Sequence, residues 1–75
     1  MSVQDVLVTV RPVAEGWLID CDAGLEPLFF GSGAQAEAHA HLLASRSART
    51  GCDSRVMVHD RRRRLVGATR YFADV

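Results

Sequence analysis

The chain has 75 residues, which is enough for one small domain and too few for a second one. Nine arginines balance nine acidic residues, so the formal net charge is zero, whereas a dedicated nucleic-acid-binding domain usually has a pI above about 9. No apolar run approaches the roughly 18 residues that a membrane-spanning helix requires. Residues 1–5 lack the basic and apolar regions of a signal peptide, so we expect a cytoplasmic protein with no membrane partner.

The charges are unevenly distributed along the chain. Residues 1–45 hold six acidic residues and one arginine, a net charge of −5, and residues 46–75 hold eight arginines and three aspartates, a net charge of +5. Such opposed halves are compatible with an anion-binding face, with head-to-tail contact between copies, or with neutralisation inside one molecule. We expect the third, because the two halves of a small sheet interleave in space.

Three strands are expected in the first 30 residues. The β-branched run at 6–11 predicts the first strand, which Pro12 should end. Residues 17–22 alternate apolar and acidic side chains, which is typical of a half-buried antiparallel strand. After a turn at 22–24, residues 25–30 should form a short third strand. Pro27 has no N–H to donate, so this strand should lie at an edge of the sheet.

One helix is predicted from about residue 33 to about residue 50. Ser32 followed by Gln35 fits a capping box, and the alanine-rich segment favours helix by intrinsic propensity. Gly51 suits the position just after a helix end. A stripe of mostly small side chains should face the sheet and allow a close approach, and it consists of Ala36, Ala40, Leu43, Ala44 and Ser47.

Two further strands, at residues 54–60 and 65–72, should follow the helix and flank an arginine-rich turn. The sequence therefore predicts a single α+β domain over residues 1–75, in the order β-β-(β)-α-β-β. In this fold, one helix packs on one face of an antiparallel sheet. We expect Trp17 to anchor the core under the helix.

Several short motifs together give the chain a family resemblance. They are Gly16-Trp17, Ala36-Glu37-Ala38, Ala40, Leu43-Ala44, Gly51, Val56-Met57-Val58-His59-Asp60-Arg61 and Tyr71. With these motifs in this order, the chain resembles domain-of-unknown-function family twenty-one eighty-eight, which comprises short bacterial proteins without an established activity. The resemblance implies the same fold and supplies no catalytic residue. The chain departs from the family pattern where Arg62-Arg63 replace a common Asp-Gly and where Arg70-Tyr71-Phe72 replace Ser-Tyr-Gly.

The sharpest feature of the sequence is its run of four arginines, Arg61, Arg62, Arg63 and Arg64. At the tip of a hairpin, four guanidinium groups could contact successive phosphates of a nucleic acid or another anion, and Arg55 and Arg70 could add further contacts. The competing interpretation is a solvated turn whose charges keep an edge hairpin from aggregating. We favour the solvated turn, because a short basic run is a weak motif.

Two pairs of adjacent aromatic residues suggest a contact surface. Neighbouring residues of a strand point to opposite faces, so one member of each pair must point away from the core. The pairs are Phe29-Phe30 and Tyr71-Phe72. We expect these four residues to support self-association, with base stacking as the alternative if they lie beside the arginines.

Metal and catalytic sites are not expected. His39 and His41 are two residues apart on the predicted helix and cannot share a metal ion; His39 should be partly buried and His41 solvated. Cys21 and Cys52 do not have the spacing of metal ligands, and we interpret them as small hydrophobic side chains. His59 has no identifiable nucleophile as a partner.

Two functional hypotheses follow from these patterns. The leading one is a non-enzymatic interaction module, without a cofactor, that forms a homodimer and binds a protein partner. The alternative is a weak nucleic-acid binder that uses the hairpin at Arg61–Arg64.

Overall fold

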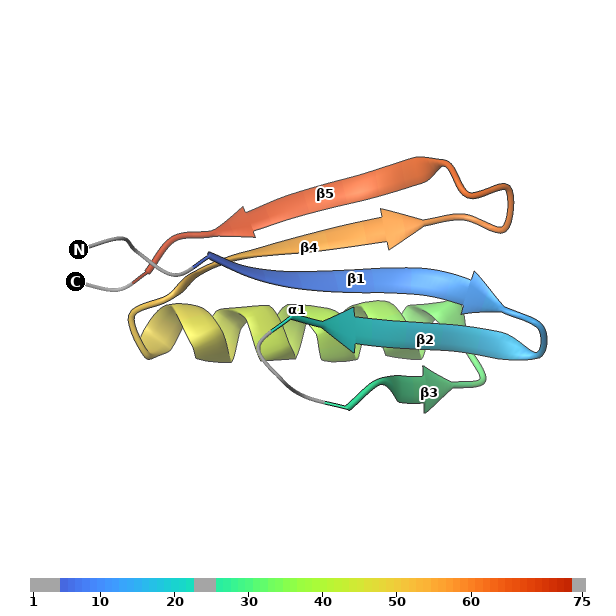
Figure 1. Cartoon of the computed structure of the whole chain (residues 1–75), viewed down its shortest axis with the longest axis horizontal. Coiled ribbons are helices and arrows are strands. Elements are labelled where there is room, and N and C mark those ends of the chain that lie inside the picture. Colours follow the sequence, from blue (N-terminus) through green and yellow to red (C-terminus); the bar gives the residue numbers. More distant parts are fainter. Residues whose placement is uncertain (1–4, 23–25, 74–75) are drawn as a thin grey trace.

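The computed structural model describes residues 5–22 and 26–73, which form five strands and one helix (Figure 1). The elements follow one another as β1 (Asp5–Val13), β2 (Gly16–Cys21), β3 (Leu28–Phe30), α1 (Gly33–Arg49), β4 (Asp53–His59) and β5 (Leu65–Tyr71). The predicted α+β fold is confirmed. The expectation about a signal peptide, and most of the expected turn at 22–24, fall on residues outside the described ranges.

The sheet has the order β3-β2-β1-β4-β5, with β1 at its centre. The pairs β1–β2, β2–β3 and β4–β5 are antiparallel, as expected, but β1 and β4 run parallel. The expectation of a purely antiparallel sheet was therefore wrong at its central pair. The reason is the connection: α1 carries the chain from β3, at one edge, past two strands, and a crossover of this length permits parallel pairing.

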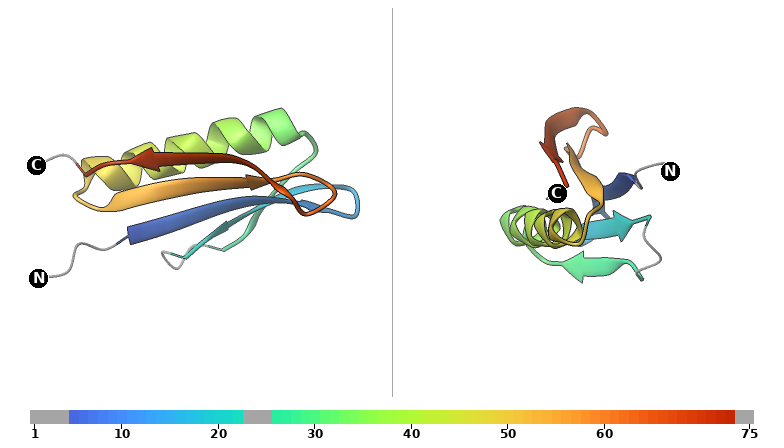
Figure 2. Two further views of the ribbon diagram at one scale, coloured as in Figure 1. Left: turned by 90° about the horizontal axis from the view of Figure 1, so that it is seen from above. Right: turned by 90° about the vertical axis from the view of Figure 1, so that its left-hand side faces the viewer.

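α1 lies across one face of the sheet, and no element of the described chain covers the other face (Figure 2). We call this other face the open face. Strand alternation sends Val6, Val8 and Val10 of β1 toward the helix, where all three are buried. Each buried side chain of this size contributes about 1.5–3 kcal/mol through the hydrophobic effect. Ile19, Val56 and Val58 complete the strand side of the core.

The helix side of the core consists of alanines. Ala36, Ala40, Ala44 and Ala48 are buried at intervals of four residues. The predicted stripe is thus confirmed at its first three alanines, whereas Leu43 and Ser47 are half-buried and Ala48 extends the stripe. Because the alanine side chains are short, the helix backbone lies close to the sheet, and the buried hydroxyl of Ser54 on β4 donates a 2.6 Å hydrogen bond to the Ala44 carbonyl. The partly buried Trp17 packs against this core, as predicted.

Both helix ends match the sequence signals. The Ser32 hydroxyl accepts a hydrogen bond from the Gln35 backbone N–H, and Gly51 takes a positive φ of 95° after the last turn. The N–H groups of Gly51 and Cys52 then reach back to the carbonyls of Ala48 and Ser47, which closes a Schellman motif. The predicted helix boundaries are confirmed within one residue.

Pro12 does not end the first strand, contrary to expectation. It lies within β1 and pairs with Trp17 of β2. On the other side of β1, pairing with β4 stops at Val10, so no second ladder requires an N–H from residue 12. β3 lies at the sheet edge, as predicted, but it is shorter than the predicted 25–30, because it begins at Leu28, just after Pro27. Among the described residues, no helix combines the length and apolar character needed to cross a bilayer.

Candidate interaction edge and basic groove

The arginine run forms the turn between β4 and β5. The backbone N–H of Arg63 donates to the Asp60 carbonyl, and the Asp60 N–H donates to the Arg64 carbonyl, each at 2.9 Å. Arg63 has a φ of 63°, the left-handed conformation that glycine adopts most easily. This geometry is a three-residue hairpin loop with a bulge at the left-handed residue. The chain therefore makes its turn without the Asp-Gly of the resembled family, and with an arginine in a strained position.

Asp60 holds this turn together through its side chain. Its Oδ1 atom accepts hydrogen bonds from the backbone N–H groups of Arg62, at 2.8 Å, and Arg64, at 2.9 Å. Its Oδ2 atom accepts one from Nε of Arg64 at 3.2 Å. The hydrogen bond from the Arg64 backbone is the largest cause that holds the pKa of Asp60 below its usual value. Desolvation, the next largest effect, opposes it, and the Arg62 N–H and the Arg64 side chain lower the pKa further.

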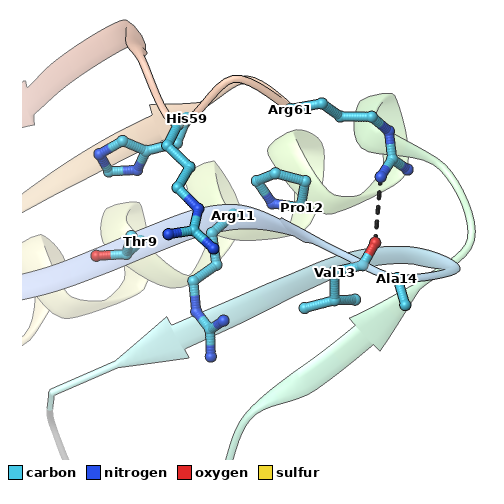
Figure 3. Close-up of a pocket in the computed structure, with 8 residues that line it drawn as sticks. Thr9, Arg11, Pro12, Val13, Ala14, His59 and Arg61 are labelled. Atoms are coloured by element: carbon cyan, nitrogen blue, oxygen red, sulfur yellow. Dashed lines mark hydrogen bonds between the residues drawn. The ribbon is translucent and has the colours of Figure 1, made fainter.

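Arg61 connects the β4–β5 hairpin to the β1–β2 hairpin. Its guanidinium donates to the carbonyl of Val13 at 3.1 Å (Figure 3). It also donates to the carbonyl of Gly16 at the long distance of 3.5 Å. The same group lies over the Trp17 ring, with its central carbon 5.1 Å from the ring centroid. The side chains of Arg61 and Arg64 therefore both have hydrogen-bond partners within the protein. Across residues 5–22 and 26–73, the Arg62 and Arg63 side chains make no hydrogen bond or ion pair.

Arg55 and Arg70 lie directly opposite each other on β4 and β5, on the open face. Each is neutralised along the sheet, Arg55 by Asp5 and Arg70 by Asp53, with 3.5 Å between the charged atoms in both pairs. On β1, the Nε atom of Arg11 binds Oδ2 of Asp20 on β2 at 2.6 Å. Opposite charges are therefore mixed on this face, and the two halves of the sequence do not form separate basic and acidic faces.

A groove lies on the molecule between the end of β1 and the β4–β5 turn, with a volume of about 740 Å³ (Figure 3). We call it the basic groove. β1 contributes Thr9 and Arg11 and continues into an apolar wall at 12–14, and the far side consists of His59, Arg61 and Arg63. No acidic side chain lines it. Arg11 was not among the sequence candidates, because only the folded sheet brings it beside residues about 50 positions later in the chain.

The four aromatic candidates separate into two inward and two outward residues. Phe30 packs against the core and lies 5.2 Å from the His39 ring, and the Tyr71 hydroxyl shares a 2.7 Å hydrogen bond with Nδ1 of His41. The expectation of a solvated His41 was thus wrong, because α1 brings this imidazole to β5. Phe29 and Phe72 are exposed by 58% and 69%. They lie at opposite edges of the sheet and form no common patch.

The clearest unpaired surface is the outer edge of the sheet at β5. This strand is seven residues long, and five of its residues are exposed. Leu65 and Val66 are 50% and 62% exposed, and the Phe72 ring follows directly after the strand. We call residues 65–72 the β5 edge. Its backbone has a neighbour on one side alone within the described chain, so its remaining N–H and C=O groups can accept another strand.

The described part of the chain contains no candidate metal site, because it has no group of three or more His, Cys, Asp or Glu residues that could hold a metal ion. Cys21 and Cys52 are free thiols that pack partly buried against the core.

Comparisons with known proteins yield no relative. No protein-family model, no curated protein and no solved structure matches the chain. The family resemblance drawn from the sequence motifs therefore stays a prediction.

Proposed function

We propose that this protein is a non-enzymatic interaction module that forms a homodimer by pairing the β5 edges of two copies. The observation that carries this proposal is the exposure of β5, a seven-residue edge strand without proline and with three large apolar side chains, Leu65, Val66 and Phe72, at or just beyond it. A long exposed edge of this kind is a template for strand addition. The opposite edge, β3, has three residues.

Antiparallel pairing with a second copy should use a register that keeps like charges apart, and we take the register centred on Ala68. If Ala68 lies on the two-fold axis, Val66 faces Arg70 of the partner subunit. In the same register, Arg64 faces Phe72 of the partner subunit. No two arginines then meet, whereas a two-fold axis at Gly67 would place Arg64 opposite the partner's Arg70. In the single copy, the central carbon of the Arg70 guanidinium lies over the Phe72 ring, 5.3 Å from the ring centroid. This ring can therefore make a cation–π contact with an arginine.

The thin core is a second support for self-association. Apart from Ile19, its fully buried apolar residues are valines and alanines, so a single copy buries little apolar area per residue. Small domains often gain stability by oligomerisation. A continuous sheet across two copies would also cover Leu65 and Val66.

Sedimentation equilibrium tests the proposal. At protein concentrations from about 1 μM to 1 mM, the wild-type mass should rise from 8.2 kDa toward twice this value. Because strand pairing and apolar contacts hold this dimer, it should persist in moderate salt. Ala68→Lys places like charges together at the two-fold axis and should weaken dimerisation at least about tenfold. Leu42→Lys, at an exposed apolar residue of α1, is the matched control and should not change the mass. A wild type that stays at 8.2 kDa throughout would refute the proposal.

The nucleic-acid alternative has weaker support, because Arg61 and Arg64 have internal partners and Arg55 and Arg70 are paired with carboxylates. Binding of a further protein partner, a cytoplasmic location and the absence of a cofactor stay predictions.

A further inference from the structure

Several cationic side chains converge in the basic groove. Three arginines line it, Arg11, Arg61 and Arg63, together with His59 and Thr9. Figure 3 shows Thr9 and Arg11 on β1, His59 at the end of β4, and the hydrogen bond from Arg61 to Val13. A volume of about 740 Å³ is within the range of small-molecule sites.

Arg63 is the residue that marks the groove as a binding site. Its left-handed backbone costs roughly 1–2 kcal/mol relative to a residue in the right-handed region, and glycine would avoid this cost. Its guanidinium nevertheless has no protein partner among the described residues and lines the groove. A strained, non-glycine residue with an unpaired charged side chain is a pattern found at ligand-binding sites.

Arg11 supplies the second group of donors. Its Nε atom binds Asp20, and its two terminal NH₂ groups have no hydrogen-bond partner among the described residues. Asp20 thus fixes the direction of the Arg11 side chain and leaves four N–H donors for a ligand. The Asp20 carboxylate is not part of the groove lining, so it leaves the lining free of negative charge.

Arg61 keeps the two walls of the groove in place. One wall belongs to the β1–β2 hairpin and the other to the β4–β5 hairpin, and the bond from Arg61 to the Val13 carbonyl joins them. The cation–π contact between the Arg61 guanidinium and the Trp17 ring also joins the two hairpins at this end of the sheet. Because Asp20 fixes Arg11 and Arg61 joins the two walls, this part of the groove loses little conformational entropy when a ligand binds.

We infer that the basic groove binds the phosphoryl group of an organic phosphate. Guanidinium forks match phosphate oxygens, and the hydroxyl of Thr9 and the ring of His59 can donate to further oxygens of a tetrahedral anion. The apolar wall at residues 12–14 provides a surface for the organic part of the ligand. The phosphoryl group can belong to a small phosphomonoester or to a nucleic-acid backbone. The inference does not depend on the dimer, since the groove contains no residue of the β5 edge.

Titrations followed by ¹⁵N–¹H NMR test the inference with three probes: inorganic phosphate, adenosine monophosphate and a short single-stranded oligonucleotide. Each titration is run at about 50 and about 200 mM salt. We expect chemical-shift changes at Thr9 and His59. Arg63→Gly should weaken binding at least about tenfold, which corresponds to the loss of one charge-assisted contact. Glycine suits the backbone of residue 63, so this loss cannot come from an unfolded turn.

Arg62→Ala is the matched control, because it removes the same charge from the same turn at an exposed residue outside the groove. It should change the affinity by less than about twofold, while Arg11→Gln should weaken binding as Arg63→Gly does. Tighter binding of adenosine monophosphate identifies a small phosphomonoester as the ligand. Binding of the oligonucleotide alone, with the same dependence on Arg63, identifies the nucleic-acid backbone. The inference is overturned if no probe binds, or if the Arg62 and Arg63 variants lose affinity equally.

Discussion

Asp60 and Arg64 are joined by three hydrogen bonds, which close the turn between β4 and β5. The Asp60 N–H donates to the Arg64 carbonyl at 2.9 Å, the Arg64 N–H donates to Oδ1 of Asp60 at 2.9 Å, and Nε of Arg64 donates to Oδ2 at 3.2 Å. The ionised carboxylate accepts from both of these Arg64 groups and from the Arg62 N–H as well, and these bonds favour the ionised form. The ionisation of Asp60 is therefore linked to the stability of the folded chain.

This linkage predicts how the stability depends on pH. The folded pKa of Asp60 is below its unfolded value, so the carboxylate stabilises the fold above about pH 4. As the pH falls through the folded pKa, this contribution is lost. Asp60→Asn should have a lower urea midpoint than the wild type at pH 7, and the two midpoints should converge at pH values below the folded pKa. A difference that stayed constant between neutral and strongly acidic pH would contradict this linkage.

A substitution in the same turn should stabilise the protein. Arg63→Gly removes the energetic cost of the positive φ of 63°. The free energy gained exceeds the cost of the greater conformational entropy of glycine in the unfolded chain. We expect a gain of about 0.5–1 kcal/mol, or roughly 4 °C in Tm, by thermal unfolding followed by circular dichroism. Arg62→Gly, whose residue has no positive φ, should destabilise the fold by up to about 1 kcal/mol. Equal effects of the two substitutions would show that residue 63 is not strained.

The close approach of the helix to the sheet predicts a sensitivity to size. Ala40 is fully buried in the middle of the alanine stripe, so Ala40→Leu has no space and should cost about 1–3 kcal/mol in the free energy of unfolding. Ala38→Leu, on the exposed side of the same helix, should change the stability by no more than about 0.5 kcal/mol. Urea unfolding of the two variants measures the difference, and comparable losses would mean that the helix does not pack as described.

The bond between His41 and Tyr71 predicts a coupling between α1 and β5. Tyr71→Phe removes the hydroxyl and should destabilise the fold by about 1 kcal/mol. In a variant that already carries His41→Ala, the same substitution should cost much less, because the partner of the hydroxyl is gone. A double-mutant cycle by urea unfolding measures this coupling. Additive effects of the two substitutions would rule the interaction out.

Local sequence signals predicted most elements of the fold. The cap at Ser32, the turn after the helix at Gly51 and the alanine spacing all act over a few residues, and each has the predicted role. Strand alternation placed Phe29 and Phe30 on opposite faces for the same reason. The parallel pairing of β1 with β4 was missed, because it depends on how the helix crosses the sheet and not on the pattern of either strand.

The candidate sites depend on contacts between distant parts of the chain, so they could be predicted only in part. The run at Arg61–Arg64 was evident from the sequence, but the Val13 carbonyl that binds Arg61 lies 48 residues earlier. The same reason explains the wrong expectation for His41, whose partner Tyr71 is 30 residues away. The exposure of Leu65 and Val66 also required the structure, since α1 lies mainly over β1 and β4 and leaves β5 outside.

Mixing two oppositely charged variants tests the proposed dimer most directly. Ala68→Lys and Ala68→Asp each place like charges at the two-fold axis of the β5 edges, so each variant alone should stay near the mass of a single chain, 8.2 kDa, at concentrations where the wild type has just become a dimer. An equimolar mixture should form a dimer of about twice this mass, because lysine then faces aspartate. If the mixture sediments as a single chain while the wild type forms a dimer, or if either variant alone forms a dimer as readily as the wild type, then the β5 edges do not pair with Ala68 at the two-fold axis.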